Sequence, residues 1–134
     1  TNHLGHFALT IPLLPYIAEN GRIVNLSSKA HTRFSHTINF DALQSSAPAQ
    51  STYDLYSQSK LANVLFTKAL ARRLQEKNSS IIVTSLHPGV VNTNLSRHYN
   101  ILVRILTEIL GQVILKTPYY GAQTSLYCIL SDQV

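Results

Sequence analysis

The chain has 134 residues, a net charge of +5 and no methionine. Hydrophobic residues make up 45% of it and charged residues 13%, a composition too apolar for a disordered tail. The single cysteine, Cys128, excludes a disulfide framework and a multi-cysteine zinc site. Because the chain begins at Thr1 and not at a methionine, we expect it to be a piece of a longer protein or a processed product.

The excess of positive charge raises the question of nucleic-acid binding. Four of the basic side chains recur at helical spacing, which is typical of one solvated helix face: Lys68, Arg72, Arg73 and Lys77. We therefore predict no nucleic-acid partner. No uncharged apolar run in the sequence approaches the roughly 20 residues that a membrane-spanning helix needs.

The first part of the chain predicts a helix, a strand and a long loop, in that order. Residues 3–17 have a helical pattern, which Pro12 could kink. After an Asn-Gly turn, residues 22–26 are rich in β-branched side chains and typical of a short buried strand. Residues 29–53 are polar and irregular, and we predict one long loop there.

The second part of the chain repeats this alternation. Residues 54–76 predict a helix in which the leucines fall near one stripe: Leu61, Leu65, Leu70 and Leu74. Residues 81–86 predict a second buried strand, which a His-Pro-Gly segment ends. An amphipathic helix over 100–115 and a last helix over 119–131 complete the pattern.

Strands that alternate with helices indicate an α/β layer with a parallel sheet. Two predicted strands are too few, because a two-stranded parallel sheet cannot cover the apolar faces of four helices. We therefore expect further strands outside this chain to complete the core.

The chemistry of the sequence centres on the Tyr-Ser-Gln-Ser-Lys segment at residues 56–60. Residues four apart on a helix share a face, so Tyr56 and Lys60 can point at one site. A free phenol is a poor base at neutral pH, but an ammonium close by favours the phenolate. The pair could thus exchange a proton with a carbonyl–alcohol couple. Taken alone, the same spacing is more often that of an exposed surface pair.

Polar and turn-forming residues follow both predicted strands. Ser27 and Ser28 follow the first strand, and His87, Pro88 and Gly89 end the second. Ligands of open α/β sheets bind at these carboxyl ends. A serine hydroxyl there could bind a substrate oxygen or cap a helix. The Pro-Gly turn could let the backbone approach a ligand, or simply form a loop.

Four segments, in this order and spacing, resemble the short-chain dehydrogenase/reductase superfamily: residues 2–7, 21–28, 56–63 and 87–93. Within the superfamily the chain is most similar to the retinol dehydrogenase-like group, which includes the WW-domain oxidoreductase type. The segments that carry this closer resemblance are Leu4-Gly5-His6-Phe7, Ser27-Ser28-Lys29-Ala30-His31, residues 59–66 and Gly121-Ala122-Gln123-Thr124.

The resemblance implies catalytic roles for four residues. Tyr56 would be the general acid and base, and Lys60 would bind the nicotinamide ribose and favour the phenolate form of Tyr56. Ser28 would hold the substrate oxygen. Asn2 would anchor a water molecule that relays protons through Lys60.

The resemblance also implies a coenzyme pocket after the second strand. Thr93, in the Pro-Gly-x-x-x-Thr pattern, would contact the nicotinamide carboxamide. Backbone groups around Pro88, Gly89 and Val91 would line the same pocket, to which Tyr56 and Lys60 also belong.

The glycine-rich dinucleotide turn and the Asn-Asn-Ala-Gly segment of the family do not occur in this sequence. In the family both precede the region of Asn2. The resemblance therefore implies an α/β fold that is the C-terminal part of a Rossmann-type doubly wound parallel sheet, without its N-terminal dinucleotide-binding strands. Residues 1–134 would form one partial, catalytic domain and no second domain. The missing part would hold the pyrophosphate and select the coenzyme.

The resemblance favours NADP, with NAD as the alternative, and a lipophilic alcohol or carbonyl substrate such as a retinoid. The parent protein is thus expected to be an oxidoreductase that exchanges a hydride with a nicotinamide. We expect the chain by itself to be inactive and poorly folded. The alternative function is a catalytically inactive truncated product that acts only as a protein-interaction module.

Residues 101–115 allow three interpretations: they cover a lipophilic substrate, lie on a membrane surface, or form a partner interface. The resemblance also allows a homodimer of the intact protein, and a location at the endoplasmic reticulum membrane or in the cytoplasm. We predict no metal site, because the histidines lack metal-ligand spacing with carboxylates: His3, His6, His31 and His36.

Overall fold

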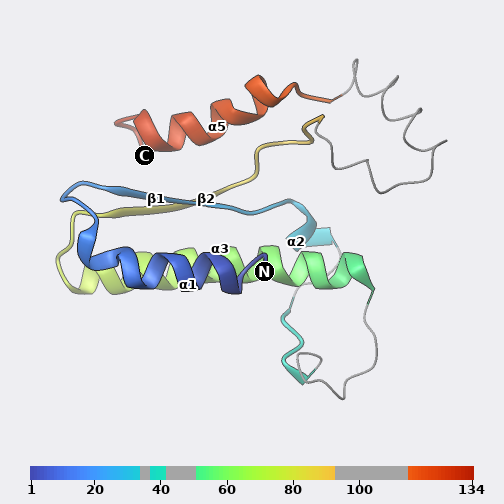
Figure 1. The fold of residues 1–134 in the computed structure, drawn as a ribbon, viewed down its shortest axis with the longest axis horizontal. Helices are drawn as coiled ribbons and strands as arrows, with labels where there is room; N and C mark the ends of the chain where they lie inside the picture. Colours follow the sequence, from blue (N-terminus) through green and yellow to red (C-terminus); the bar gives the residue numbers. More distant parts are fainter. Residues whose placement is uncertain (34–36, 42–50, 93–114) are drawn as a thin grey trace. The chain divides into compact units, whose positions relative to one another are not determined.

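The computed structural model describes residues 1–33, 37–41, 51–92 and 115–134. The chain divides into two compact units, Thr1–His87 and Pro88–Val134, and each is described by itself. The first unit carries both predicted strands, and the second carries the C-terminal helix (Figure 1).

Two strands lie side by side in the first unit: β1 spans Arg22–Leu26 and β2 spans Ile82–Leu86 (Figure 1). They pair in parallel over their full length, with Leu26 opposite Leu86. This pairing confirms the predicted α/β arrangement, and β2 begins one residue later than predicted. Because the strands are parallel, both end at the same edge of the pair.

The sequence predicts both strands to be buried, whereas most of their residues are only half-buried. The buried residues of the pair are Asn25 and Leu86. The prediction that the strands are buried is therefore wrong for the part of the chain that the structure describes. A sheet of two strands has two open edges, and the described helices cover its faces only in part.

The first helix, α1, spans Leu4–Leu13 and continues as a 3₁₀ turn, η1, over Leu14–Tyr16. The helical region predicted over 3–17 is thus confirmed, and the change of helix type follows Pro12, which removes a backbone donor. None of the ten residues of α1 is buried, and Leu4 is 71% exposed. This apolar helix therefore presents a face that the described residues leave uncovered.

A short helix, α2, spans Ala30–Arg33, within the segment predicted as one long loop. The loop prediction is wrong for these residues. The helix forms because Ser28 Oγ accepts a hydrogen bond from the Ala30 amide at 3.2 Å, which is the pattern of an N-terminal cap. Much of the predicted loop, at 34–36 and 42–50, lies outside the described residues.

The long helix α3 spans Thr52–Glu76 and packs along the two strands (Figure 1). Its start is capped by Ser51, since Ser51 Oγ accepts a hydrogen bond from the Asp54 amide at 3.1 Å. Its end is followed by Asn78, which has a left-handed backbone with a φ of 53°. The helix predicted over 54–76 is confirmed, with a start two residues earlier.

The buried side of α3 is mostly polar, and its buried residues are Ser57, Gln58, Asn63, Thr67 and Leu70. Of the leucines predicted to fall near one stripe, Leu70 is buried, Leu61 and Leu74 are half-buried, and Leu65 is 48% exposed. Leu70 and Leu86 are the buried hydrophobic residues of the described part of the chain, which is a small core. The basic residues predicted on a solvated face are all exposed: Lys68, Arg72, Arg73 and Lys77.

The second unit contains the helix α5, Pro118–Leu130. Thr117 Oγ1 accepts a hydrogen bond from the Tyr120 amide at 3.4 Å, and proline in the first turn is equally typical of a helix start. The last helix, predicted over 119–131, is thus confirmed with a shift of one residue.

The amphipathic helix predicted over 100–115 lies, apart from its last residue, outside the described residues. Leu115 is in a bend, and Lys116 pairs with Val91 in an isolated parallel bridge. Among the helices that the structure does describe, none is both long and apolar enough to cross a membrane.

Candidate active site

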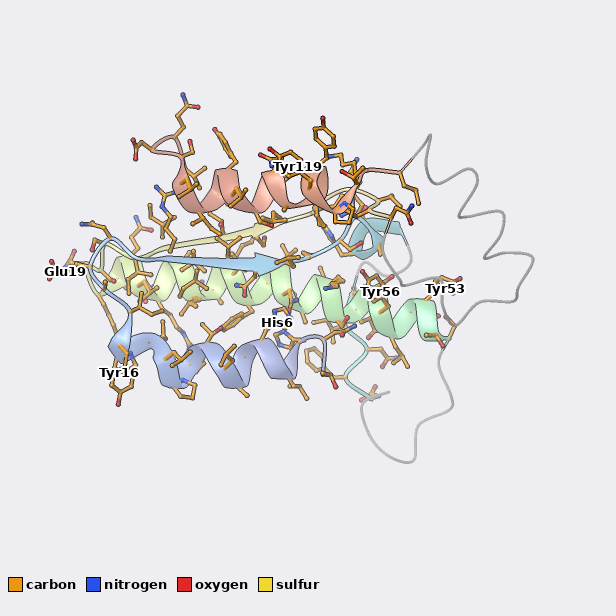
Figure 2. All side chains as sticks on the ribbon, turned by 45° about the horizontal axis from the view of Figure 1, so that its top comes forward. His6, Tyr16, Glu19, Tyr53, Tyr56 and Tyr119 are labelled. Carbon is orange, nitrogen blue, oxygen red and sulfur yellow. The ribbon has the colours of Figure 1, made fainter. Side chains whose placement is uncertain are left out.

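Tyr56 and Lys60 lie one turn apart in the N-terminal half of α3, where Figure 2 shows Tyr56. The Lys60 ammonium lies over the aromatic ring of Tyr56, with Nζ 5.6 Å from the ring centroid. Attraction between a cation and a ring face favours this arrangement. Tyr56 is 39% exposed, so its phenol can meet a ligand. The structure therefore brings the two residues together as the spacing predicts.

Lys60 is half-buried and is tied to the end of β1. Its Nζ donates a hydrogen bond to the carbonyl oxygen of Leu26, the last residue of β1, at 3.2 Å. Burial lowers the pKa of Lys60, because desolvation disfavours the charged ammonium. An ammonium carries three N–H groups, so Lys60 can donate two more hydrogen bonds to a ligand.

Ser27 and Ser28 follow β1 directly, and they have different partners. Ser27 is buried: its amide donates to Leu86 O at 2.7 Å and its hydroxyl to Lys60 O at 2.7 Å. Ser28 is half-buried, and its hydroxyl oxygen accepts from the Ala30 amide. The interpretation of Ser28 as a helix cap is thus confirmed. The hydroxyl proton can still be donated to a substrate oxygen, so a catalytic role is compatible with the cap.

Asn2 lies two residues before the start of α1 and is exposed. Its main-chain carbonyl accepts a hydrogen bond from Asn63 Nδ2 at 3.2 Å. The same nitrogen donates to Leu26 O at 3.1 Å, the oxygen that also receives the Lys60 hydrogen bond. Asn2, the end of β1 and Lys60 are therefore joined through one buried side chain.

Two histidines of α1 and its N-terminal end lie close to this group. Asn63 Oδ1 accepts a hydrogen bond from His3 Nδ1 at 3.0 Å. His6 lies on the side of α1 that faces α3 (Figure 2). Its pKa is lowered from 6.5, first by burial and then by the positive charges of Lys60 and His3. Among the described residues, no three metal-binding side chains form a group that could hold an ion.

The motif analysis did not assign His3, His6 or Asn63 to the site. Asn63 carried a usable signal, because a polar residue three positions after Lys60 shares its face of the helix. The two histidines gave no such signal, since their proximity to Lys60 depends on how α1 packs against α3.

Of the residues predicted to form the coenzyme pocket, Tyr56 and Lys60 belong to the first unit, and Pro88, Gly89, Val91 and Thr93 belong to the second. Gly89 has a φ of 91°, a left-handed conformation that favours glycine. The side chain of Lys116 packs against it, with Cε 3.1 Å from the place that a Cβ of Gly89 would take. Val91 pairs with Lys116 in the isolated bridge. Thr93 lies outside the described residues, and the roles of Pro88, Gly89 and Val91 stay predictions.

A cavity of about 350 Å³ borders another side of α3. Side chains of Leu4, Phe40 and Leu55 contribute to its lining, which is mostly apolar. Of the predicted catalytic residues, Asn2 lines this cavity, and Tyr56 and Lys60 are not among its lining residues.

Comparisons with known proteins agree with this geometry. A family model for short chain dehydrogenases matches residues 1–101. Retinol dehydrogenase 14 of Homo sapiens is 47% identical over 137 aligned residues, which cover 99% of this chain and 39% of that protein. Polyprenol dehydrogenase of Homo sapiens is 40% identical and covers 99% of this chain and 41% of that protein.

Solved structures show the same fold. An uncharacterized protein from Mycobacterium paratuberculosis has a TM-score of 0.70 and 38% identity, covering 98% of this chain and 41% of that one. A short chain dehydrogenase from Burkholderia cenocepacia, solved in complex with NADP, has a TM-score of 0.62 and 20% identity, covering 95% of this chain and 46% of that one.

The chain belongs to the short-chain dehydrogenase family, and its α/β fold is a part of the family's Rossmann fold. Within the family it falls in the retinol dehydrogenase-like group, as the relatives at 40–47% identity show. The chain spans about 40% of the length of these curated relatives.

Proposed function

We propose that this chain is the catalytic part, over residues 1–134, of an oxidoreductase that interconverts an alcohol and its carbonyl by hydride exchange with a nicotinamide. The observation that carries the proposal is the pairing of an exposed phenol with an ammonium, Tyr56 with Lys60, at 5.6 Å from Nζ to ring centroid. The ammonium is tied to the strand end that Ser28 follows. Membership of the short-chain dehydrogenase family supports the same reaction class.

In this proposal each residue moves or holds a proton. Tyr56 protonates the carbonyl oxygen during reduction and takes the alcohol proton during oxidation. Ser28 donates its hydroxyl proton in a hydrogen bond to the same substrate oxygen. The positive charge of Lys60 stabilises the negative charge that develops on the phenol oxygen as the proton leaves. The Asn2 carbonyl has a second lone pair, with which it can hold a water molecule that relays protons.

A nicotinamide ribose fits the residues that are present. Lys60 can donate two further hydrogen bonds, which matches the two neighbouring hydroxyls of a ribose. When bound, the coenzyme would supply or accept the hydride. Backbone groups of Pro88, Gly89 and Val91 and the side chain of Thr93 would contact the nicotinamide. We propose NADP before NAD, on the resemblance to the retinol dehydrogenase-like group.

For the substrate we propose a lipophilic alcohol or carbonyl compound such as a retinoid. Two of the human relatives are named retinol dehydrogenase and polyprenol dehydrogenase, after apolar alcohols. Residues 101–115 are proposed to cover such a substrate, because their apolar side chains would exclude water from it. Contact of the same segment with a membrane surface is the alternative.

Replacement of Tyr56 by Phe in the full-length protein that contains this chain tests the proposal. The phenol oxygen is lost while the ring stays, so turnover should fall by at least about a hundredfold. The dissociation constant for NADPH should change by less than about twofold, because Lys60 still binds the ribose. Tyr53→Phe is the matched control, since Tyr53 is an exposed tyrosine less than one turn earlier on α3, and it should retain the wild-type rate. A Tyr56→Phe protein that keeps most of its activity would refute the acid–base role.

The second candidate function is that of an inactive product that binds a partner through exposed apolar surface. The uncovered face of α1 favours it, since Leu4 is 71% and Leu9 65% exposed. Size-exclusion chromatography of the chain with its full-length relative tests this function. Co-elution without turnover supports it, and a lone aggregate of the chain refutes it.

A further inference from the structure

Asn63 is fully buried on α3, three residues after Lys60. Its Nδ2 donates hydrogen bonds to Asn2 O at 3.2 Å and to Leu26 O at 3.1 Å. Its Oδ1 accepts from His3 Nδ1 at 3.0 Å. The hydrogen bonds orient the amide, because two carbonyl oxygens can only accept and therefore face its NH₂ group. They also require the proton of the imidazole to be on Nδ1 of His3.

The Leu26 carbonyl is the point at which this network meets the catalytic pair. It accepts one hydrogen bond from Asn63 and one from Lys60 Nζ, at 3.1 and 3.2 Å. Leu26 ends β1 and is followed by Ser27 and Ser28. The position of this one oxygen therefore determines where the ammonium of Lys60 is held.

We propose that Asn63 is a positioning residue of the alcohol–carbonyl site: its amide holds the Leu26 and Asn2 carbonyls in place for Lys60 and the proton relay, and His3 fixes the amide. The inference rests on the proposed function. Without the amide, the Leu26 carbonyl loses one of its two donors and the Asn2 carbonyl is released. Lys60 is then held less closely, although no residue that touches substrate or coenzyme has been changed.

A purely structural role would have different consequences, and Thr67 provides the control. Thr67 is also buried on α3, one turn after Asn63, and is also fully hydrogen-bonded. Its hydroxyl accepts from Asn25 Nδ2 at 2.9 Å and donates to Asn63 O at 2.8 Å. Neither of these two partners is Lys60 or Leu26, so Thr67→Val removes polar contacts of the helix without touching the side-chain amide of Asn63.

The experiment compares Asn63→Leu with Thr67→Val in the full-length protein. For Asn63→Leu, we expect the dissociation constant of NADPH, followed by its fluorescence, to rise about tenfold, because the ammonium that binds the ribose is misplaced. The kcat of alcohol oxidation should fall about tenfold, because the displaced ammonium stabilises less well the negative charge that develops on the phenol oxygen. Thr67→Val should lower the thermal midpoint and leave both quantities within about twofold.

A second pair of variants keeps the test decisive if Asn63→Leu does not fold. His3→Asn and His3→Leu both remove the ring that packs near Phe7 and Phe66. Only His3→Asn keeps an N–H donor near the position of Nδ1. We expect His3→Leu to weaken NADPH binding and His3→Asn to restore at least part of the loss. Equal effects of the two variants would contradict the role of the His3 hydrogen bond.

The outcomes separate this inference from the proposed function. If Tyr56→Phe abolishes turnover but Asn63→Leu behaves like Thr67→Val, Asn63 is only structural and the inference fails alone. If the wild-type protein transfers no hydride, or Tyr56→Phe is fully active, the proposed function fails first. A lower NADPH affinity and a lower kcat in Asn63→Leu, with both unchanged in Thr67→Val, would support the inference.

Discussion

Burial, together with the positive charge of Lys60 and His3, determines how His6 on α1 titrates. Burial and the positive charges of Lys60 and His3 lower the pKa of His6 below 6.5. In the unfolded chain, His6 binds its proton near the ordinary value. Stability rises with pH wherever the unfolded state binds more protons. The folded state should therefore lose stability as the pH falls from 6.5 through the lowered pKa of His6.

We expect His6→Asn to remove part of this acid sensitivity, because the variant has no imidazole to protonate on unfolding. Urea unfolding of the full-length protein at about pH 7.5 and about pH 5.5 measures the effect. The wild type should lose more stability between the two conditions than the variant does. Equal losses would mean that other groups cause the acid sensitivity.

At the residue scale, contacts between residues close in the sequence could be predicted, whereas contacts between distant segments could not. Tyr56 and Lys60 could be paired, because their four-residue spacing fixes a common face in any helix. Ser28 could be predicted only as two alternatives, because its hydroxyl partner depends on whether α2 forms. The spacing of Asn63 from Lys60 could place it on the same face of the helix, but its partners, Asn2 and Leu26, could not be predicted because the fold brings them to it.

At the scale of the elements, the close packing of Gly121 in α5 against Val91 can be tested by substitution. Gly121 is buried, and a Cβ added there would lie 2.5 Å from Val91 Cγ2. We expect Gly121→Ala to destabilise the folded state by about 1–3 kcal/mol, because the side chain or the helix must shift. Val91→Ala in the same protein should recover part of the loss, which chemical unfolding measures.

Gly5→Ala is the matched control for the glycine substitution. Gly5 lies in α1, and a Cβ there meets nothing within 4 Å. Alanine at this helical position should stabilise the protein by about 0.5–1 kcal/mol, because it restricts the unfolded chain. If Gly121→Ala raises the free energy of unfolding, as Gly5→Ala is expected to do, the packing of α5 on Val91 is described wrongly.

The elements that could be predicted are those with a clear local pattern. The strand over 22–26 was predicted with its correct bounds, because a β-branched run lies between a turn and a pair of serines. The short helix α2 was missed. Four residues are too few to show a helical period, and the hydrogen bond from the Ala30 amide to Ser28 Oγ is seen only in the structure. The stripe of leucines on α3 does not show which of them is covered: Leu70 is buried beside Asn63 and Thr67, whereas Leu65 is 48% exposed.

At the scale of the whole molecule, the small core is the dominant feature. Leu70 and Leu86 are the buried hydrophobic residues of the described ranges, and every residue of α1 is at least partly exposed. Burial of apolar surface is the main favourable term in folding, and small cores leave little net stability. This agrees with the expectation from the strand count that further strands complete the sheet.

We therefore predict that the 134-residue chain by itself neither binds NADPH tightly nor unfolds in a sharp transition. Differential scanning calorimetry and NADPH fluorescence titration of the isolated chain measure both properties. The full-length protein is the control and should show both. Tight binding with a cooperative transition in the isolated chain would overturn the view that its core is incomplete.

The class of fold could be predicted from the alternation of helices and strands, whereas the extent of the core could not. Alternation is a property of the sequence, and it correctly gave the parallel pairing of β1 and β2. The burial of a strand depends on what covers it from elsewhere. Both strands accordingly looked buried by composition and are half-buried in the described residues.

Single-turnover reduction with coenzyme deuterated at the transferred position tests the central claim most directly. In the wild-type full-length protein, deuterium should appear on the carbinol carbon of the product. In Tyr56→Phe the rate of that transfer should fall at least about a hundredfold, with bound coenzyme unchanged, because the proton donor is lost. Deuterium transfer at the wild-type rate in Tyr56→Phe would contradict the account.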